Sequence, residues 1–293
     1  MRVTNHTFFQ SSLENIQKGF SELEAANRRT AHGLKVERPS DDPSSAAEIL
    51  ATSRDLRANE QFSRNIEDGN RRLRTEETVL DSLTDILGRT RELATAEAGA
   101  TGDANSRAAA KLEVDQLFFA AVSHGNTFVS GAYLFGGRYA DVKPFDPAGA
   151  PSVTQPPQGE HHLQIGETET AIANHDGEQV FLNSNVFSAM TNLSAALGAD
   201  DGPAIQSSLS DLNLAFDNVQ GLLTEVGARS NRLERAQVYI ETHEFTLIEK
   251  RSSLQDADLA ETALEFANKQ NVLQGAMLAT SRAISLTITE YLR

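Results

Sequence analysis

The chain has 293 residues, of which 39% are hydrophobic and 23% charged, so it can bury a sizeable core and form more than one domain. Its net charge of −15 argues against binding to nucleic acid or to an anionic membrane, and no apolar run approaches the ~18 residues of a membrane span. Because cysteine is absent, disulfides, thiolate zinc sites and cysteine nucleophiles are excluded.

The first predicted helix covers residues 8–35, and Gly33 and Pro39 end it. Along it, side chains recur in alternating steps of four and three residues, which places them on one face. This row consists of Phe9, Leu13, Ile16, Phe20, Leu23, Asn27, Thr30 and Leu34. Asp42 is expected to cap the next helix, with Pro43 in the first helical position.

The second predicted helix runs from Pro43 to Ala98 and would extend on the order of 80 Å, which indicates a rod. Its inward row is Phe62, Ile66, Gly69, Leu73, Glu76, Leu80, Leu83, Leu87, Thr90 and Ala94. After a break at residues 99–102, Asp103 is expected to cap a third helix. The inward residues expected of this third helix are Leu112, Phe119, Val122 and Val129.

The middle of the chain has a different character. Five of the eight prolines lie between Pro144 and Pro157, which excludes helix there. Strands are predicted over residues 162–165, 168–173 and 179–182, with a hairpin turn at Asp176-Gly177 between the last two. We interpret residues 138–185 as a small β-rich insertion.

Helices return after the insertion. Asn185 is expected to cap a short helix that ends at Gly198, and Pro203 opens a long one that continues to Leu254. Its row begins with Ile205, Leu209, Leu212, Phe216, Val219, Leu223 and Val226. The phase then slips, and Asp256 or Asp258 is expected to cap the last helix.

The last predicted helix carries two rows. The first is Leu259, Ala263, Phe266, Gln270, Leu273, Met277, Thr280, Ile284, Thr287 and Tyr291. The second is Leu264, Ala267, Leu278, Leu286 and Leu292. Together the two rows form a stripe wider than one partner helix covers, so we expect neighbouring subunits to cover the remainder. The expected assembly interface is Phe9, Leu13, Ile16, Phe20, Leu23, Leu34, Leu259, Phe266, Leu273, Met277, Ile284, Tyr291 and Leu292.

These patterns predict a mainly α fold: an elongated antiparallel helical bundle or coiled coil formed by paired N- and C-terminal arms, with a small β-rich inserted domain. The predicted domains are a terminal coiled-coil assembly domain (residues 1–38 with 256–293), an inner helical rod (39–137 with 186–255) and the insertion (138–185).

No catalytic, cofactor-binding or metal site is expected. His161 and His162 have no third spaced ligand. Residues 243–247 begin like the helix motif of zinc proteases, but Leu247 stands where the second histidine of that motif must be. Residues 174–178 contain oxygen ligands without the spacing of an EF-hand, and residues 131–137 lack the Lys-Ser/Thr pair of a phosphate loop.

Three segments resemble the flagellin superfamily, and in particular its hook–filament junction proteins. They are residues 39–43 between the first two helices, residues 131–137 after the third helix, and residues 253–258 before the final heptads. The ending, residues 288–293, differs from the usual flagellin ending and favours a junction protein over flagellin.

This resemblance implies a structural subunit that is exported through the flagellum without a cleaved signal and resides in the extracellular flagellum. The segment 1–7 has no apolar core, consistent with that expectation. Implied partners are a ring of like subunits, a hook-side hook-associated protein, filament flagellin and an export chaperone. The insertion would face outward.

Two other classes remain open at this point: a flagellin of the filament itself, and, without any flagellar role, a cytoplasmic coiled-coil scaffold or chaperone.

Overall fold

The computed structural model describes residues 5–99, 102–129, 131–152 and 156–291. The chain divides into two compact units, one formed by residues 1–57 and 243–293 and the other by residues 58–242. Both units are built mainly from helices, so the predicted mainly α class is confirmed.

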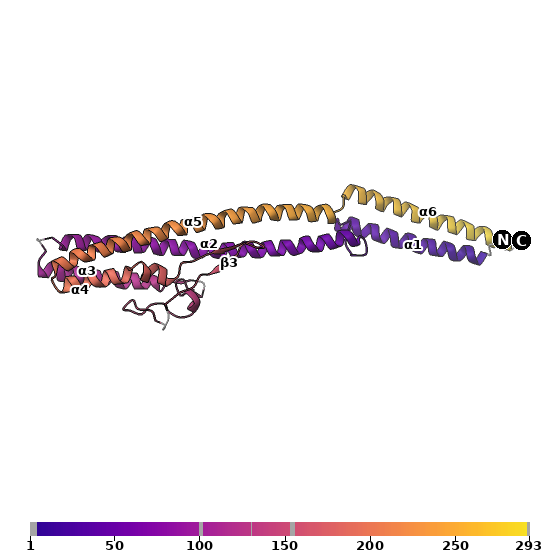
Figure 1. Ribbon diagram of the computed structural model, residues 1–293. Coiled ribbons are helices and arrows are strands. Elements are labelled where there is room, and N and C mark those ends of the chain that lie inside the picture. Colours follow the sequence, from indigo (N-terminus) through magenta and orange to yellow (C-terminus); the bar gives the residue numbers. More distant parts are fainter. Residues whose placement is uncertain (1–4, 100–101, 130, 153–155, 292–293) are drawn as a thin grey trace. The chain divides into compact units, whose positions relative to one another are not determined.

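The first unit contains α1 (Asn5–His32) and α6 (Leu259–Tyr291), which lie side by side and antiparallel (Figure 1). It also contains the start of α2 (Pro43–Glu97) and the end of α5 (Gly202–Gln255). Gly33 ends α1 with φ +68°, a left-handed conformation that favours glycine, and its N–H bonds to Arg29 O at 2.8 Å. The first helix therefore ends at His32, before the predicted end at residue 35.

Two of the predicted caps in this unit are confirmed. Asp42 accepts the backbone N–H groups of Ser44 at 3.0 Å and Ser45 at 3.2 Å, and so caps α2. Asp258, rather than Asp256, caps α6 by accepting the N–H of Ala260 at 2.7 Å.

The second unit is built on α2 and α5, which run antiparallel and bury their predicted rows against each other. In α2 the row from Ile66 to Ala94 is buried throughout, and it includes the side chains of Glu76 and Thr90. In α5, Ile205, Val219 and Leu233 are fully buried. The four-three spacing therefore identified both core faces correctly.

Beside this pair lie α3 (Ala104–Gly125) and α4 (Val186–Gly198), which pack on each other (Figure 1). Asp103 caps α3 as predicted, and Ser106 completes a reciprocal capping box. Asn185 precedes α4 with φ +58° but forms no side-chain cap, so that part of the prediction is wrong.

The inward face predicted for α3 is also wrong. Leu112 and Phe119 are 68% and 52% exposed, and Val129 lies outside the helix in β1 (Phe128–Val129). Of the predicted residues only Val122 is buried. The buried face is instead made largely of small side chains, which bring α3 close to its neighbours: Ala110, Val114, Ala121, Val122 and Gly125.

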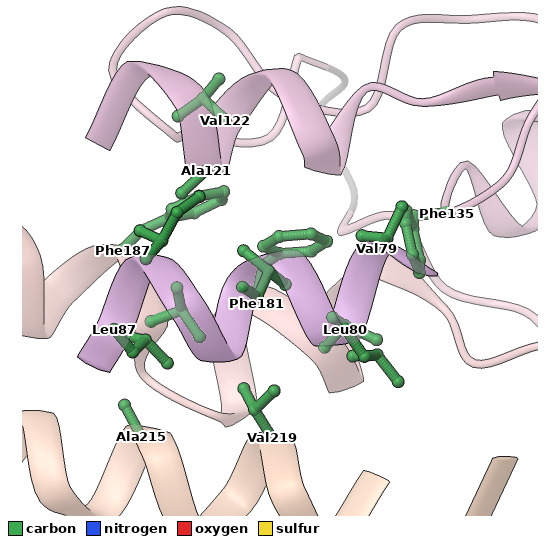
Figure 2. Close-up of a cluster of buried hydrophobic side chains, with 14 of the residues drawn as sticks. Val79, Leu80, Leu87, Ala121, Val122, Phe135, Phe181, Phe187, Ala215 and Val219 are labelled. Atoms are coloured by element: carbon green, nitrogen blue, oxygen red, sulfur yellow. The ribbon is translucent and has the colours of Figure 1, made fainter. Parts of the chain in front are cut away.

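An aromatic cluster joins the middle segment to the helices (Figure 2). Phe181 and Phe187 are stacked with ring centroids 5.0 Å apart, and the ring of Phe145 meets both edge-on. In Figure 2 the rings of Phe181 and Phe187 lie over one side of α2, while Ala215 and Val219 of α5 lie on the other. The middle segment thus contributes to the same core as the helices.

The strands predicted for the middle segment are only partly present. In the described residues β3 (His162–Gln164) pairs with β4 (Thr170–Ile172), and β1 pairs with β2 (Ala132–Tyr133) around Gly131. A 3₁₀ turn, η1 (Gly137–Tyr139), follows β2. Neither β1 nor β2 was predicted from the sequence, and the segment is less β-rich than expected.

The strand predicted over residues 179–182 is wrong, because Glu178–Asn183 forms a π-helix, labelled η2. The adjacent side chains of Val180 and Phe181 are both fully buried, which an alternating strand with one solvated face does not allow. Asp176 does not form a hairpin turn; its carboxylate accepts the N–H of Gln179 at 2.9 Å and starts the helical turn.

Candidate assembly interface on α1 and α6

Polar contacts set the antiparallel register of α1 against α6. Arg29 Nη1 lies 2.8 Å from Glu265 Oε2, and Lys269 Nζ lies 2.7 Å from Glu22 Oε2. The hydrogen bond from Lys269 lowers the pKa of the Glu22 carboxyl. Because these pairs are solvent-exposed, they contribute little to the stability of the helix pair, and their main effect is to fix its register.

Small residues form the actual contact row of α1. Gly19, Ala26 and Gly33 recur every seven residues, and Ala26 is fully buried. Leu273 of α6, only 5% exposed, fits against Gly19: a Cβ at that position would lie 3.2 Å from Leu273 Cδ1. The prediction from sequence missed this row because it followed large apolar side chains; the seven-residue Gly/Ala spacing was the available signal.

The predicted interface residues therefore divide into two groups. Those at the α1–α6 contact are half-buried or buried: Ile16, Leu23, Leu34, Phe266 and Leu273. The others are 46% to 63% exposed: Phe9, Leu13, Phe20, Leu259 and Met277. Leu292 lies outside the described residues, as do the side chains of Ile284 and Tyr291.

The predicted row of α1 lies on one side of the helix, but it is not centred on the contact with α6. At 100° per residue, Phe9, Leu13 and Phe20 lie about a quarter turn away from Gly19 and Ala26. They form a separate apolar face that α6 leaves open. The expectation of an uncovered second row on α6 is confirmed, because Leu264 and Leu278 are 67% and 62% exposed.

We use the name open apolar face for the exposed large side chains of this helix pair. Its members are Phe9, Leu13, Phe20, Leu259, Leu264, Val272, Met277 and Leu278. Burying each such side chain would contribute about 1.5–3 kcal/mol. A concentration of exposed large apolar side chains on one helix pair favours a protein–protein interface.

The structure gives less support to a metal-binding or small-molecule site than to an assembly interface. Within the described residues no group of three or more His, Asp and Glu side chains is arranged to hold a metal ion. One pocket, with a volume of about 350 Å³, lies between α3, α4 and residues 147–148. The carboxylate that lines it, Asp115, already binds Lys111 at 2.6 Å and Ser194 at 2.5 Å. Over the same described part of the chain, no helix is long and apolar enough to cross a membrane.

Comparison with known proteins extends over both ends of the chain. Residues 3–140 match the family model described as the bacterial flagellin N-terminal helical region, and residues 209–292 match that of the C-terminal helical region. The flagellar hook-associated protein 3 of Escherichia coli K12 is 23% identical, over 95% of this chain and 96% of that protein. The flagellar filament 33 kDa core protein of Treponema phagedenis is 24% identical, over 99% and 100%.

Solved structures show the same fold. The crystal structure of Bacillus cereus FlgL has a TM-score of 0.60 at 23% identity, covering 69% of this chain and 99% of that one. The flagellar hook associated protein-3 of Legionella pneumophila has a TM-score of 0.63 at 15% identity, covering 70% and 98%.

Proposed function

Because the chain belongs to the bacterial flagellin family, we propose that it is a structural subunit of the flagellum that joins the hook to the filament. The near full-length similarity to a hook-associated protein supports this assignment over that of a filament subunit. As a flagellar component it belongs to the extracellular appendage, and we extend the proposal to export without a cleaved signal.

The observation that carries the assembly mechanism is the open apolar face of α1 and α6. A helix pair that leaves this many large apolar side chains exposed buries little apolar surface. Ordering their backbone opposes folding by about 1–2 kcal/mol per residue. Sister copies that cover the open apolar face would supply the missing burial, so assembly and the final ordering of both helices are coupled.

This mechanism gives the terminal segments, residues 1–38 and 256–293, a role in assembly. In the proposal they contact like subunits around a ring, with a hook-associated protein on one side and filament flagellin on the other. An export chaperone would cover the open apolar face before assembly. The polar residues Thr30 and Thr262 at the contact row hold the register, through a 3.2 Å hydrogen bond from Thr30 Oγ1 to Thr262 O.

Replacing Phe20 tests the interface directly. Phe20 is 63% exposed, so Phe20→Ser should leave the fold intact but remove apolar area from the open apolar face. We expect cells that carry only this variant to shed filaments and lose motility, while the purified variant keeps its helical content by circular dichroism. Gln10→Ser, at an exposed polar position of the same helix, is the matched control and should swim normally. Normal motility and filament retention in Phe20→Ser would refute the interface.

The contact between Leu273 and Gly19 suggests a second variant, which hydrogen exchange distinguishes from the first. Leu273→Asp places a carboxylate against Gly19, so it should separate α1 from α6 and abolish incorporation while the second unit stays folded. Hydrogen exchange should rise in α1 and α6 alone. Exchange that rises equally in α2 and α5 would contradict the proposed independence of the terminal helices.

A filament subunit is the second candidate, supported by the similarity to the Treponema filament core protein over its whole length. Polymerisation separates the two roles. A junction subunit should stay unpolymerised when purified by itself, whereas long filaments grown from this protein alone, seen by electron microscopy, would favour the filament role.

A further inference from the structure

A buried histidine connects the middle segment to both long helices of the second unit. His175 follows β4 and precedes η2, and it is 2% exposed. On one side lies Glu76 of α2, whose side chain is fully buried, and on the other lies Glu225 of α5. The proposed assembly role uses none of these three side chains.

Both ring nitrogens of His175 face carboxylate oxygens. Nδ1 lies 2.5 Å from Glu76 Oε1, and Nε2 lies 3.3 Å from Glu225 Oε2, an ion-pair contact without hydrogen-bond geometry. Both oxygens of Glu76 also accept the backbone N–H of His175, each at 3.2 Å. A neutral imidazole has one N–H and one lone pair, so one of its nitrogens would present a lone pair to a negative oxygen.

Only the imidazolium, with a proton on each nitrogen, matches this pair of carboxylates. We propose that doubly protonated His175 is a proton-dependent clamp that holds the segment around residues 173–177 against α2 and α5 and loosens as the pH rises. This His175 clamp consists of His175, Glu76, Glu225 and Arg229.

The charges around the ring support this protonation state. From α5, Arg229 pairs with Glu225 at 2.7 Å and also donates to the carbonyl of Asn174. From α2, Glu76 has His175 as its ion-pair partner among the described residues. The neighbouring carboxylate, Asp176, accepts backbone N–H groups of Gly159 at 3.0 Å and of Gln179. With a neutral ring, the fully buried Glu76 carboxylate would lack a cation.

The direction of the pH dependence follows from proton linkage. An exposed histidine loses its second proton above about pH 6.5. In the proposal, the two carboxylates beside the buried ring hold that proton while the segment is closed. The clamp therefore contributes fully at low pH and progressively less as the pH rises. For one proton, the opening equilibrium changes by at most about tenfold per pH unit.

Nitrogen NMR of the full-length ¹⁵N-labelled protein tests the protonation state. At pH 7 we expect both ring nitrogens of His175 to show imidazolium shifts, with the signal assigned by its loss in His175→Gln. Glu76→Gln removes the buried charge, so the same ring should then be neutral at pH 7. A single-tautomer neutral ring in the wild type would overturn the proposal.

Hydrogen exchange over residues 159–177 tests the release and does not require His175→Gln to fold. Between pH 6.5 and 8.5, after correction for intrinsic exchange, the opening equilibrium should rise by up to about tenfold per unit in the wild type and stay flat in Glu76→Gln. His162→Gln is the matched control, because His162 is 57% exposed beside the solvent-exposed Glu160, and it should keep the wild-type slope. Equal slopes in the wild type and Glu76→Gln, or no slope in the wild type, would reject the clamp.

Discussion

At the residue scale, three glycines show how one residue type has opposite effects in this chain. At Gly69 of α2, a Cβ would lie 2.8 Å from Leu163 Cδ1 and 2.9 Å from Leu233 Cδ1, so the absent side chain lets the β3–β4 hairpin and α5 approach. At Gly221 of α5 a Cβ would meet nothing within 4 Å, and the same holds for Gly275 of α6. Gly69 is structural, whereas the other two only weaken their helices.

A matched pair of alanine substitutions in the second unit distinguishes these roles. Gly69→Ala should lower the free energy of unfolding by about 1–3 kcal/mol, because two leucine side chains must shift. Gly221→Ala should raise it by about 0.5–1 kcal/mol, because alanine favours helix and meets no neighbour. Chemical denaturation of the full chain measures both, and a stabilising Gly69→Ala would show that the hairpin does not pack as described.

At the element scale, the helices with long apolar rows were predictable and the tightly packed ones were not. The α2 and α5 rows place leucine, isoleucine and valine toward a single partner helix, so spacing alone identified them. In α3 and α1 the contact faces use glycine and alanine, and several of the large side chains stay exposed. Hydrophobic periodicity weights side-chain size, so it identified the open apolar face of α1 instead of its contact row.

Aspartate N-caps mark where several of the helices begin, and most of these caps could be predicted from the sequence. Asp42, Asp103 and Asp258 each cap the helix that follows. The prediction failed at Asp176, because its Asp-Gly pair predicts a hairpin while its carboxylate accepts the N–H of Gln179 in the π-helical turn. The His175 clamp could not be predicted from the sequence, because it joins residues 99 positions apart and depends on their burial in the fold.

The N-cap of α2 should respond to acid. The hydrogen bond from the Ser45 hydroxyl, followed by backbone N–H bonds, lowers the pKa of Asp42 below its ordinary 3.8. A lowered carboxyl pKa stabilises the fold above the ordinary value and loses that contribution as pH falls through the folded value. Amide exchange at Ser44 and Ser45 should therefore rise, after intrinsic correction, as pH falls below about 4. Asp42→Asn keeps a cap that does not titrate, so its protection should be independent of pH in this range; equal pH dependence in both proteins would contradict the assignment.

At the scale of the whole molecule, the two compact units differ in what completes them. The second unit encloses an aromatic and aliphatic core contributed by α2, α3, α4, α5 and the middle segment. The first unit leaves its large apolar side chains on α1 and α6 uncovered. The second unit thus has an enclosed core of its own, whereas we expect the first unit to need neighbouring subunits to cover its apolar side chains.

A fragment tests this difference in completeness. Residues 39–256 retain the whole second unit and lack α1 and α6, so we expect a soluble monomer with a cooperative thermal transition. In the full chain, α1 and α6 should lose protection at lower temperature than that transition. A fragment that melts without cooperativity would show that the terminal helices belong to a common core.

The loops at the base of the two arms are bonded backbone to backbone. Lys35 N–H donates to Gln255 O at 2.8 Å, and Ala257 N–H donates to Gly33 O at 2.9 Å, on either side of the bridge between Leu34 and Asp256. These bonds tie the base of α1 to the base of α6, so we expect the two arms to enter a growing structure together. A docking subunit that captures one terminus would then bring both, so each addition delivers two helices that are already in antiparallel register.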